Sequence, residues 1–147
     1  MLPDSSDIDA AVIVALQNDA QLASYAPNGV YMDEAPPGST AFVIVSIIDA
    51  LDVGEFGQRS QEDILYMIEF RERKPTTGAG NAKAAAQRIQ AVLEDQPLTI
   101  AGYTWMTVHR ETRERKTEVD EVDPSIRWNR RGGQYRVQVS LNPFTRT

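Results

Sequence analysis

The 147-residue chain contains no cysteine and a single histidine, His109. Without cysteine it has no disulfide framework, no thiolate metal site and no cysteine nucleophile. The lack of cysteine also fits a reducing compartment. A lone histidine in an expected strand is more often a surface or packing residue than a catalytic one, and no Gly-x-Ser-x-Gly motif accompanies it. The sequence therefore offers no recognisable histidine- or cysteine-based catalytic constellation.

Long apolar runs are also missing. The longest, at 41–45 and 64–68, are far shorter than the roughly 20 residues that span a bilayer. The first residues carry Asp4, Asp7 and Asp9, whereas a signal peptide begins with basic residues. We therefore expect a soluble, non-secreted protein that does not associate with a membrane.

Basic residues are scarce in the first half of the chain. Residues 1–70 hold 12 acids and only one base, Arg59, whereas residues 71–147 hold 14 bases and 9 acids. The net charge of −6 and the pI near 4.8 argue against general nucleic-acid binding, which needs clustered cations. The hydrophobic fraction of 41% is ordinary for a folded protein, and the length suits one domain spanning 1–147. The asymmetry between the halves indicates a charged partner.

The hydrophobic periodicity predicts helices and strands in a mixed order. Apolar residues at helical spacing predict helices at 6–22, with Ser6 as N-cap, and at 81–95, with Asn81 as N-cap. A β-branched run at 40–48, apolar on both parities, predicts a strand covered on both faces. Residues 49–60 contain two glycines and four charges, which predict a loop. Further strands are expected at 30–31, 61–71, 98–110 and 134–141.

Strands that come in adjacent pairs suit antiparallel hairpins. The predicted fold class is therefore α+β: a single, mostly antiparallel sheet with two helices packed on one face. Between the last two strands, residues 110–134 are very polar. We interpret them as a long charged, projecting β-hairpin arm whose strands continue the flanking ones and whose tip is mobile or ordered by a partner.

Two sequence features are weak candidates for a phosphate-binding or metal-dependent catalytic site. Residues 78–81 read Gly-Ala-Gly-Asn before a helix, but they lack the Lys-Ser/Thr of a phosphate-binding loop, which favours a plain linker. Asp120, Glu121 and Asp123 supply oxygen ligands for a metal-dependent hydrolase, yet the central glycine and distal glutamate of a calcium loop are missing. A solvated loop is the more ordinary interpretation. No catalytic residue, metal or cofactor is predicted.

Basic, acidic and basic blocks of residues follow one another along 110–136. This charge pattern is the most specific functional feature of the sequence. One interpretation is a solvated loop. Another is a nucleic-acid module that uses Arg127, Trp128 and the adjacent arginines. We favour an arm that lies across the acidic first half of another copy, because such heterologous contacts close into rings. The expected cationic contacts are Arg110, Arg113, Arg115, Lys116, Arg130 and Arg131, and the expected acceptors, placed in loops, are Asp33, Glu34, Asp49, Asp52 and Glu55.

The order of the pieces carries a family resemblance over nearly the whole chain. It consists of Ile-Asp-Ala-Ala-Val-Ile-Val-Ala-Leu at 8–16, Gly-Val-Tyr-Met-Asp-Glu-Ala-Pro-Pro at 29–37, the apolar strand 41–45, a second strand at 64–70, the alanine-rich helix at 82–89, Leu-Thr-Ile-Ala-Gly at 98–102 and Tyr-Arg-Val-Gln-Val at 135–139. This arrangement resembles the tail-terminator, or tail-completion, proteins of long-tailed bacteriophages, the group that includes the lambda-type tail terminator. The long charged stretch 111–133 departs from the shorter polar link usual there.

The resemblance implies a structural role in a virion. Members of the family form hexameric rings that cap the growing tail tube, stop its polymerisation and present a surface to the head-side connector. The implied partners are other copies of the chain, the tail-tube protein and the head–tail connector, while DNA passes through the lumen without specific binding. The implied location is the virion tail or neck, after synthesis in the host cytoplasm. The related alternative is another neck component, either a head–tail joining protein or a tail-tube subunit.

Overall fold

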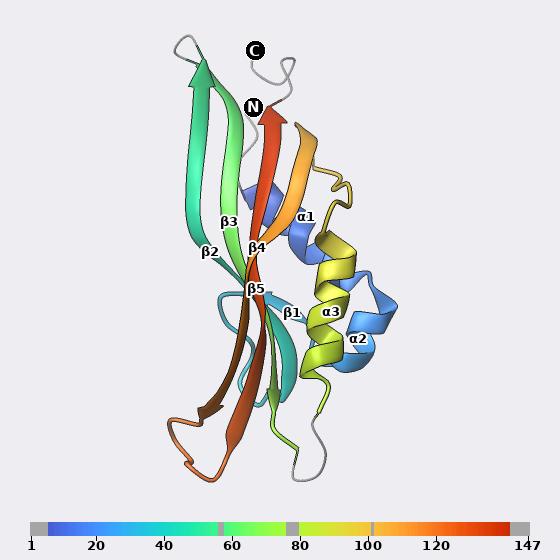
Figure 1. Ribbon diagram of the computed structural model, residues 1–147, viewed down its shortest axis with the longest axis vertical. Coiled ribbons are helices and arrows are strands. Elements are labelled where there is room, and N and C mark those ends of the chain that lie inside the picture. Colours follow the sequence, from blue (N-terminus) through green and yellow to red (C-terminus); the bar gives the residue numbers. More distant parts are fainter. Residues whose placement is uncertain (1–5, 56–57, 76–79, 101, 142–147) are drawn as a thin grey trace.

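The computed structural model describes residues 6–55, 58–75, 80–100 and 102–141. Within these ranges the chain forms three helices and five strands (Figure 1). The helices are α1 (Ser6–Gln17), α2 (Ala20–Tyr25) and α3 (Ala82–Leu93). The strands are β1 (Val30–Met32), β2 (Ala41–Glu55), β3 (Gln58–Arg73), β4 (Tyr103–Val119) and β5 (Arg127–Leu141).

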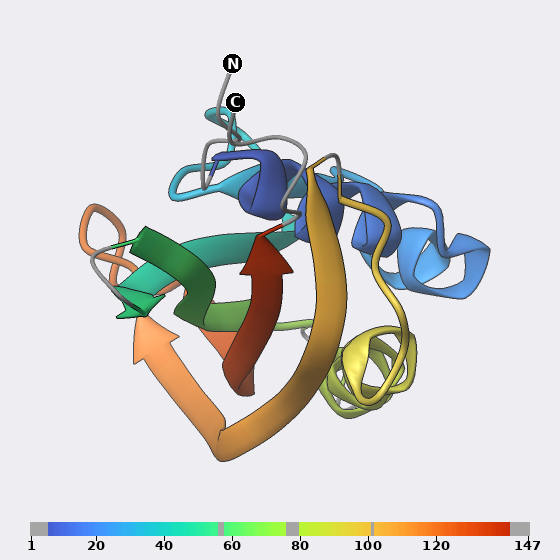
Figure 2. The ribbon, with the colours of Figure 1, turned by 90° about the horizontal axis from the view of Figure 1, so that it is seen from above.

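The strands form one curled sheet in the order β1-β2-β3-β5-β4. The short edge strand β1 runs parallel to β2, and the other neighbours are antiparallel. The helices gather on one side of the sheet, and the view from above shows how strongly the sheet twists (Figures 1 and 2). The predicted α+β class is confirmed, with three helices instead of two.

The third helix arises from a break in the first predicted one. The expected helix at 6–22 ends at Gln17, and Asp19 then begins α2 by accepting a hydrogen bond from the Leu22 N–H at 2.9 Å. Asp19 also receives two 2.7 Å hydrogen bonds from Arg88 of α3. An aspartate whose side chain caps a new helix competes with continuation of the old one. The prediction of one continuous helix was therefore wrong.

The core lies between the helices and the sheet. One parity of β3, including Ile64, Tyr66, Ile68 and Phe70, faces the helices and is buried, as predicted. The small side chains of α3, such as Ala85, let that helix approach the strands. In β2, residues 42–45 are buried on both parities as predicted, while the exposed Ile47 and Ile48 are not. Within the described parts, no helix is long and apolar enough to cross a membrane.

The β2–β3 hairpin replaces the predicted loop at 49–60. β2 continues to Glu55 and stays paired with β3, with register shifts between Ile47 and Asp49 and between Val53 and Gly54. Asp49, Asp52 and Glu55, predicted to lie in loops, are therefore strand residues. A paired strand satisfies its backbone groups through its neighbour, so charged residues and a glycine do not end it. Residues 56–57 fall outside the described residues.

The predicted arm at 110–134 is a hairpin, but most of it belongs to the main sheet. β5 is flanked by β4 on one side and by β3 on the other, with β3 pairing continuing as far as Arg73 opposite Trp128. Only residues 120–126 lie between the two strands, at the lower end of the molecule in Figure 1. The prediction of a long charged hairpin whose strands continue the flanking ones is confirmed, while the pairing of β5 with β3 along this stretch was not predicted.

Candidate functional site

A basic groove lies between α3 and the β4–β5 hairpin. Its cavity volume is about 460 Å³, and its charged lining consists of Lys83, Arg110, Arg113, Arg115, Arg131 and one acid, Glu114. Four of the six arginines and lysines predicted from the sequence meet here. A second cavity of about 350 Å³ shares Lys83, Arg115 and Arg131 with it. The lining of the second cavity also includes Lys116 and Arg130, and the name basic groove is kept for the first cavity.

A register shift in β4 brings its arginines to one face. Arg110 pairs with Tyr135, and after the irregularity Arg113 pairs with Gly133 and Arg115 with Arg131. Residues three apart on a regular strand point to opposite faces, so the extra residue at the shift turns Arg113 back to the side of Arg110. No feature of the sequence predicts this shift. Regular strand alternation alone would place Arg110 on the opposite face from Arg113 and Arg115.

Gly133 makes room for one of the long basic side chains of the groove, whose lining also includes Ala86 and Gly132. A Cβ added to Gly133 would lie 2.2 Å from the Thr112 carbonyl oxygen and 3.0 Å from the Arg110 Cδ, so a glycine is needed where that arginine crosses the strand. Lys83 joins the groove from α3, although its position on the polar face of the predicted helix gave it no special role.

The charges of the groove are weakly compensated inside the chain. Among the described residues, Lys83, Arg113, Arg115 and Arg131 make no ion pair. Arg110 hydrogen-bonds the Tyr135 hydroxyl, whose pKa rises to about 12 chiefly because the ring is buried. A concave surface with one sign of charge focuses the field and attracts anions. The groove is thus suited to an acidic partner.

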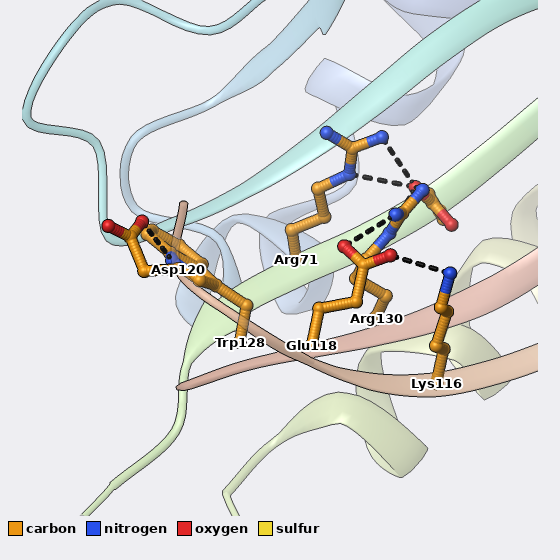
Figure 3. Close-up of polar contacts among 7 residues, drawn as sticks. Arg71, Lys116, Glu118, Asp120, Trp128 and Arg130 are labelled. Atoms are coloured by element: carbon orange, nitrogen blue, oxygen red, sulfur yellow. Dashed lines mark hydrogen bonds and ion pairs between the residues drawn. The ribbon is translucent and has the colours of Figure 1, made fainter. Parts of the chain in front are cut away.

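The other two predicted cations, Lys116 and Arg130, belong to an ion-pair ladder across the sheet (Figure 3). Arg130 contacts Glu69 at 2.6 Å and Glu118 at 2.7 Å, and Lys116 contacts Glu118 at 2.6 Å. Hydrogen bonds from Lys116 and Arg130 hold the pKa of Glu118 down at about 2. Glu69 alternates along β3 with the core residues, so this ladder lies on the sheet face away from the helices.

The predicted acidic acceptors are dispersed. Asp33 and Glu34 are exposed in the turn after β1, where Asp33 has a φ of 63°. Asp49 is exposed on β2. The backbones of Asp52 and Glu55 lie in β2, and their side chains fall outside the described residues. Within one chain, none of the described acceptors pairs with the basic groove.

The acidic turn at 120–126 is held by its own carboxylates. Asp120 accepts hydrogen bonds from the backbone N–H groups of Val122 (3.1 Å) and Asp123 (2.9 Å). Asp123 accepts bonds from the Ser125 N–H (3.0 Å) and hydroxyl (2.7 Å), which lower its pKa. Carboxylates used in this way stabilise a turn. Across the described ranges, no group of three or more potential ligand side chains is placed to hold a metal ion.

The Trp128 side chain also makes contacts within its own chain. Its indole N–H donates to Asp120 at 3.1 Å, and its ring packs edge-on against Phe42 with centroids 6.0 Å apart.

The Asn81 side chain, expected to cap α3, makes no capping hydrogen bond. Instead the buried Glu72 accepts the Asn81 N–H at 3.0 Å. Residues 76–79, which include Gly78 and Ala79 of the glycine-containing linker, lie outside the described residues.

Comparisons with known proteins identify relatives of the fold. No protein-family model matches the chain. No curated protein matches it in sequence. Among solved structures, the chain is similar to one described as "Virion of native gene transfer agent (GTA) particle", with a TM-score of 0.64, 24% identity, and coverage of 92% of this chain and 96% of that one. A second solved structure has a TM-score of 0.55 and 12% identity, covering 95% of this chain and 96% of the other. These two structures share the fold of this chain almost from end to end.

Proposed function

We propose that the chain is a virion structural protein, specifically a tail terminator. In this role its copies form a six-membered ring that caps the tail tube, stops polymerisation of the tube protein and joins the head-side connector. The observation that carries the proposal is the end-to-end fold similarity to a chain of a gene transfer agent virion. The order of sequence pieces that resembles tail terminators points the same way. The proposed role is structural and involves no catalytic step or cofactor.

The proposed ring is held by charge complementarity between copies. The cations of the basic groove, with Lys116 and Arg130 beside it, would face acids of the neighbouring copy, among them Asp33, Glu34, Asp49, Asp52 and Glu55. The weak internal compensation of the groove supports this proposal, because unpaired cations leave a surface field for a partner. Exposed pairs contribute roughly 0–1 kcal/mol each, so assembly needs several of them. The net charge of −6 is compatible with a lumen through which DNA passes without binding.

Oligomeric mass tests the proposal and separates it from its nearest alternative. Light scattering after size exclusion, with negative-stain images of the peak, should show closed rings of six protomers whose association weakens as salt rises. A tail-tube subunit would polymerise into open tubes instead, and a head–tail joining protein would bind the connector without stopping tube growth. A chain that stays monomeric at high concentration, in low and high salt and with tube protein present, would overturn the proposal.

A further inference from the structure

We propose that the acidic tip of the β4–β5 turn in one copy inserts into the basic groove of a neighbouring copy. The tip consists of Glu121, Val122 and Asp123. This inference rests on the proposed ring and specifies the contact that builds it. It gives the groove a specific occupant in addition to the acids of the first half of the chain.

The tip has the shape and order of an inserting element. The Asp120 N–H donates to the Ile126 carbonyl at 2.9 Å, and the Ile126 N–H donates to the Asp123 carbonyl at 3.0 Å. Together with the carboxylate hydrogen bonds described above, these contacts fix the turn before any partner arrives. A preordered loop loses less conformational entropy on binding than a flexible one. The tip therefore suits a specific docking contact.

Val122 marks the centre of the tip. Its side chain is 93% exposed, the highest value among the large exposed hydrophobic residues of the described chain. Glu121 and Asp123, both exposed, flank it. The lining of the groove is complementary in charge, because it contains Lys83 and four arginines against one acid, and these long side chains also have aliphatic stems. The acids of the tip would meet the cations, and Val122 would meet the stems.

The tip cannot reach the groove of its own chain. It continues β4 and β5 beyond their last pair, Val119 and Arg127. Arg115 lies six residues before Glu121, which at about 3.3 Å per residue along an extended strand places the tip roughly 20 Å from it. The paired strands prevent the hairpin from folding back. A tip that occupies the groove therefore comes from another copy, and such a contact between two different patches of identical chains is heterologous, which gives a ring when the rotation closes.

Charge reversal on each side of the contact tests the inference. Glu121→Lys with Asp123→Lys should weaken self-association at least tenfold, measured by sedimentation velocity, and so should Arg113→Glu with Arg115→Glu. Mixing the two double variants should recover association, because each provides the charge that the other needs. All four positions are exposed, so circular dichroism should match that of the unchanged protein. Because Asp123→Lys also removes the two hydrogen bonds from Ser125, Glu121→Lys alone, which keeps them, should weaken association in the same direction.

A matched pair of exposed acids outside both proposed contacts serves as the control. Asp7→Lys with Asp95→Lys makes the same charge change and should leave association within about twofold. Unchanged association of the tip variant, or a larger loss in the control, would overturn the inference while the ring itself remains. A wild-type chain that never associates would overturn both the inference and the proposed function. Binding of a labelled DNA oligonucleotide that is lost in the arginine variant, without loss of association, would assign the groove to nucleic acid and overturn the inference.

Discussion

Glu69 is the residue whose loss should reveal how the sheet is held together away from the helices. It is 2% exposed. Its Oε1 atom accepts hydrogen bonds from Arg71 Nε at 2.7 Å and from Arg130 Nε at 2.9 Å and Nη2 at 2.6 Å. The substitution Glu69→Gln keeps the size and one acceptor but removes the charge. Each guanidinium can then keep a hydrogen bond to a neutral amide oxygen, but it loses the opposite charge of the carboxylate.

The expected cost follows from that exchange. A hydrogen bond to a charged group contributes about 1.5–3 kcal/mol and a neutral one about 1 kcal/mol, a difference of about 1 kcal/mol for each guanidinium. The side chains of Arg71 and Arg130 are 32% and 24% exposed, so water partly compensates and no larger figure is warranted. Two guanidiniums give about 2 kcal/mol, or a fall in Tm of roughly 4–8 °C for a chain of this size.

Urea unfolding with an unchanged m-value is the appropriate assay, because it reports the free energy of unfolding directly. The control is Glu34→Gln, the same change at an exposed position, which should stay within about 0.5 kcal/mol of wild type. A loss below about 0.5 kcal/mol for Glu69→Gln would show that both arginines are satisfied by solvent. The ladder would then contribute nothing to stability.

Three further changes test other parts of the fold. Gly132→Ala should lower the free energy of unfolding by about 3 kcal/mol or more, or prevent folding, because its Cβ would lie 2.1 Å from the Ile68 carbonyl oxygen. Chemical denaturation measures this loss, and an unchanged stability would contradict the β3–β5 packing. Asp19→Asn should lower the free energy of unfolding by about 1 kcal/mol, because it loses the charged contact with Arg88. Asp19→Ala should lower it by about 1 kcal/mol more, because the α2 cap is lost as well. Equal losses would mean that the cap does not contribute to stability. The pKa of Glu118 falls to about 2 in the folded protein. The ion pairs of Glu118 therefore stabilise the fold fully above the ordinary pKa of a glutamate, near 4.3, and this stabilisation is lost as the pH falls through about 2. Glu118→Gln should therefore lower Tm clearly at pH 7 and only slightly near pH 2, and an undiminished difference at pH 2 would contradict this.

The sequence predicted the elements that depend on local pattern. The helix around Ala85 and the strands around Ile68 and Val137 follow from periodicity, since their buried parities repeat regularly. The continuation of β2 through Asp49 to Glu55 was not predictable in this way. Its pairing with β3 is a tertiary effect that overrides the local preference for a loop.

The candidate site was predictable in composition but not in geometry. The run of bases after Arg110 indicated a cationic surface, and four of them do line one groove. The register shift that brings Arg113 to the side of Arg110 depends on strand pairing, which composition does not reveal. For the same reason the division between the groove and the Glu69–Arg130–Glu118 ladder, and the participation of Lys83, emerged only from the structure.

Tube length tests the proposed role most directly. Tail-tube protein of the same particle would be polymerised with and without this chain, and the lengths would be measured by electron microscopy. The account predicts that added protein caps one tube end with a ring and halts further growth there, while tubes without it keep lengthening. Tubes that grow equally long at saturating protein, with no ring at either end, would contradict the central claim.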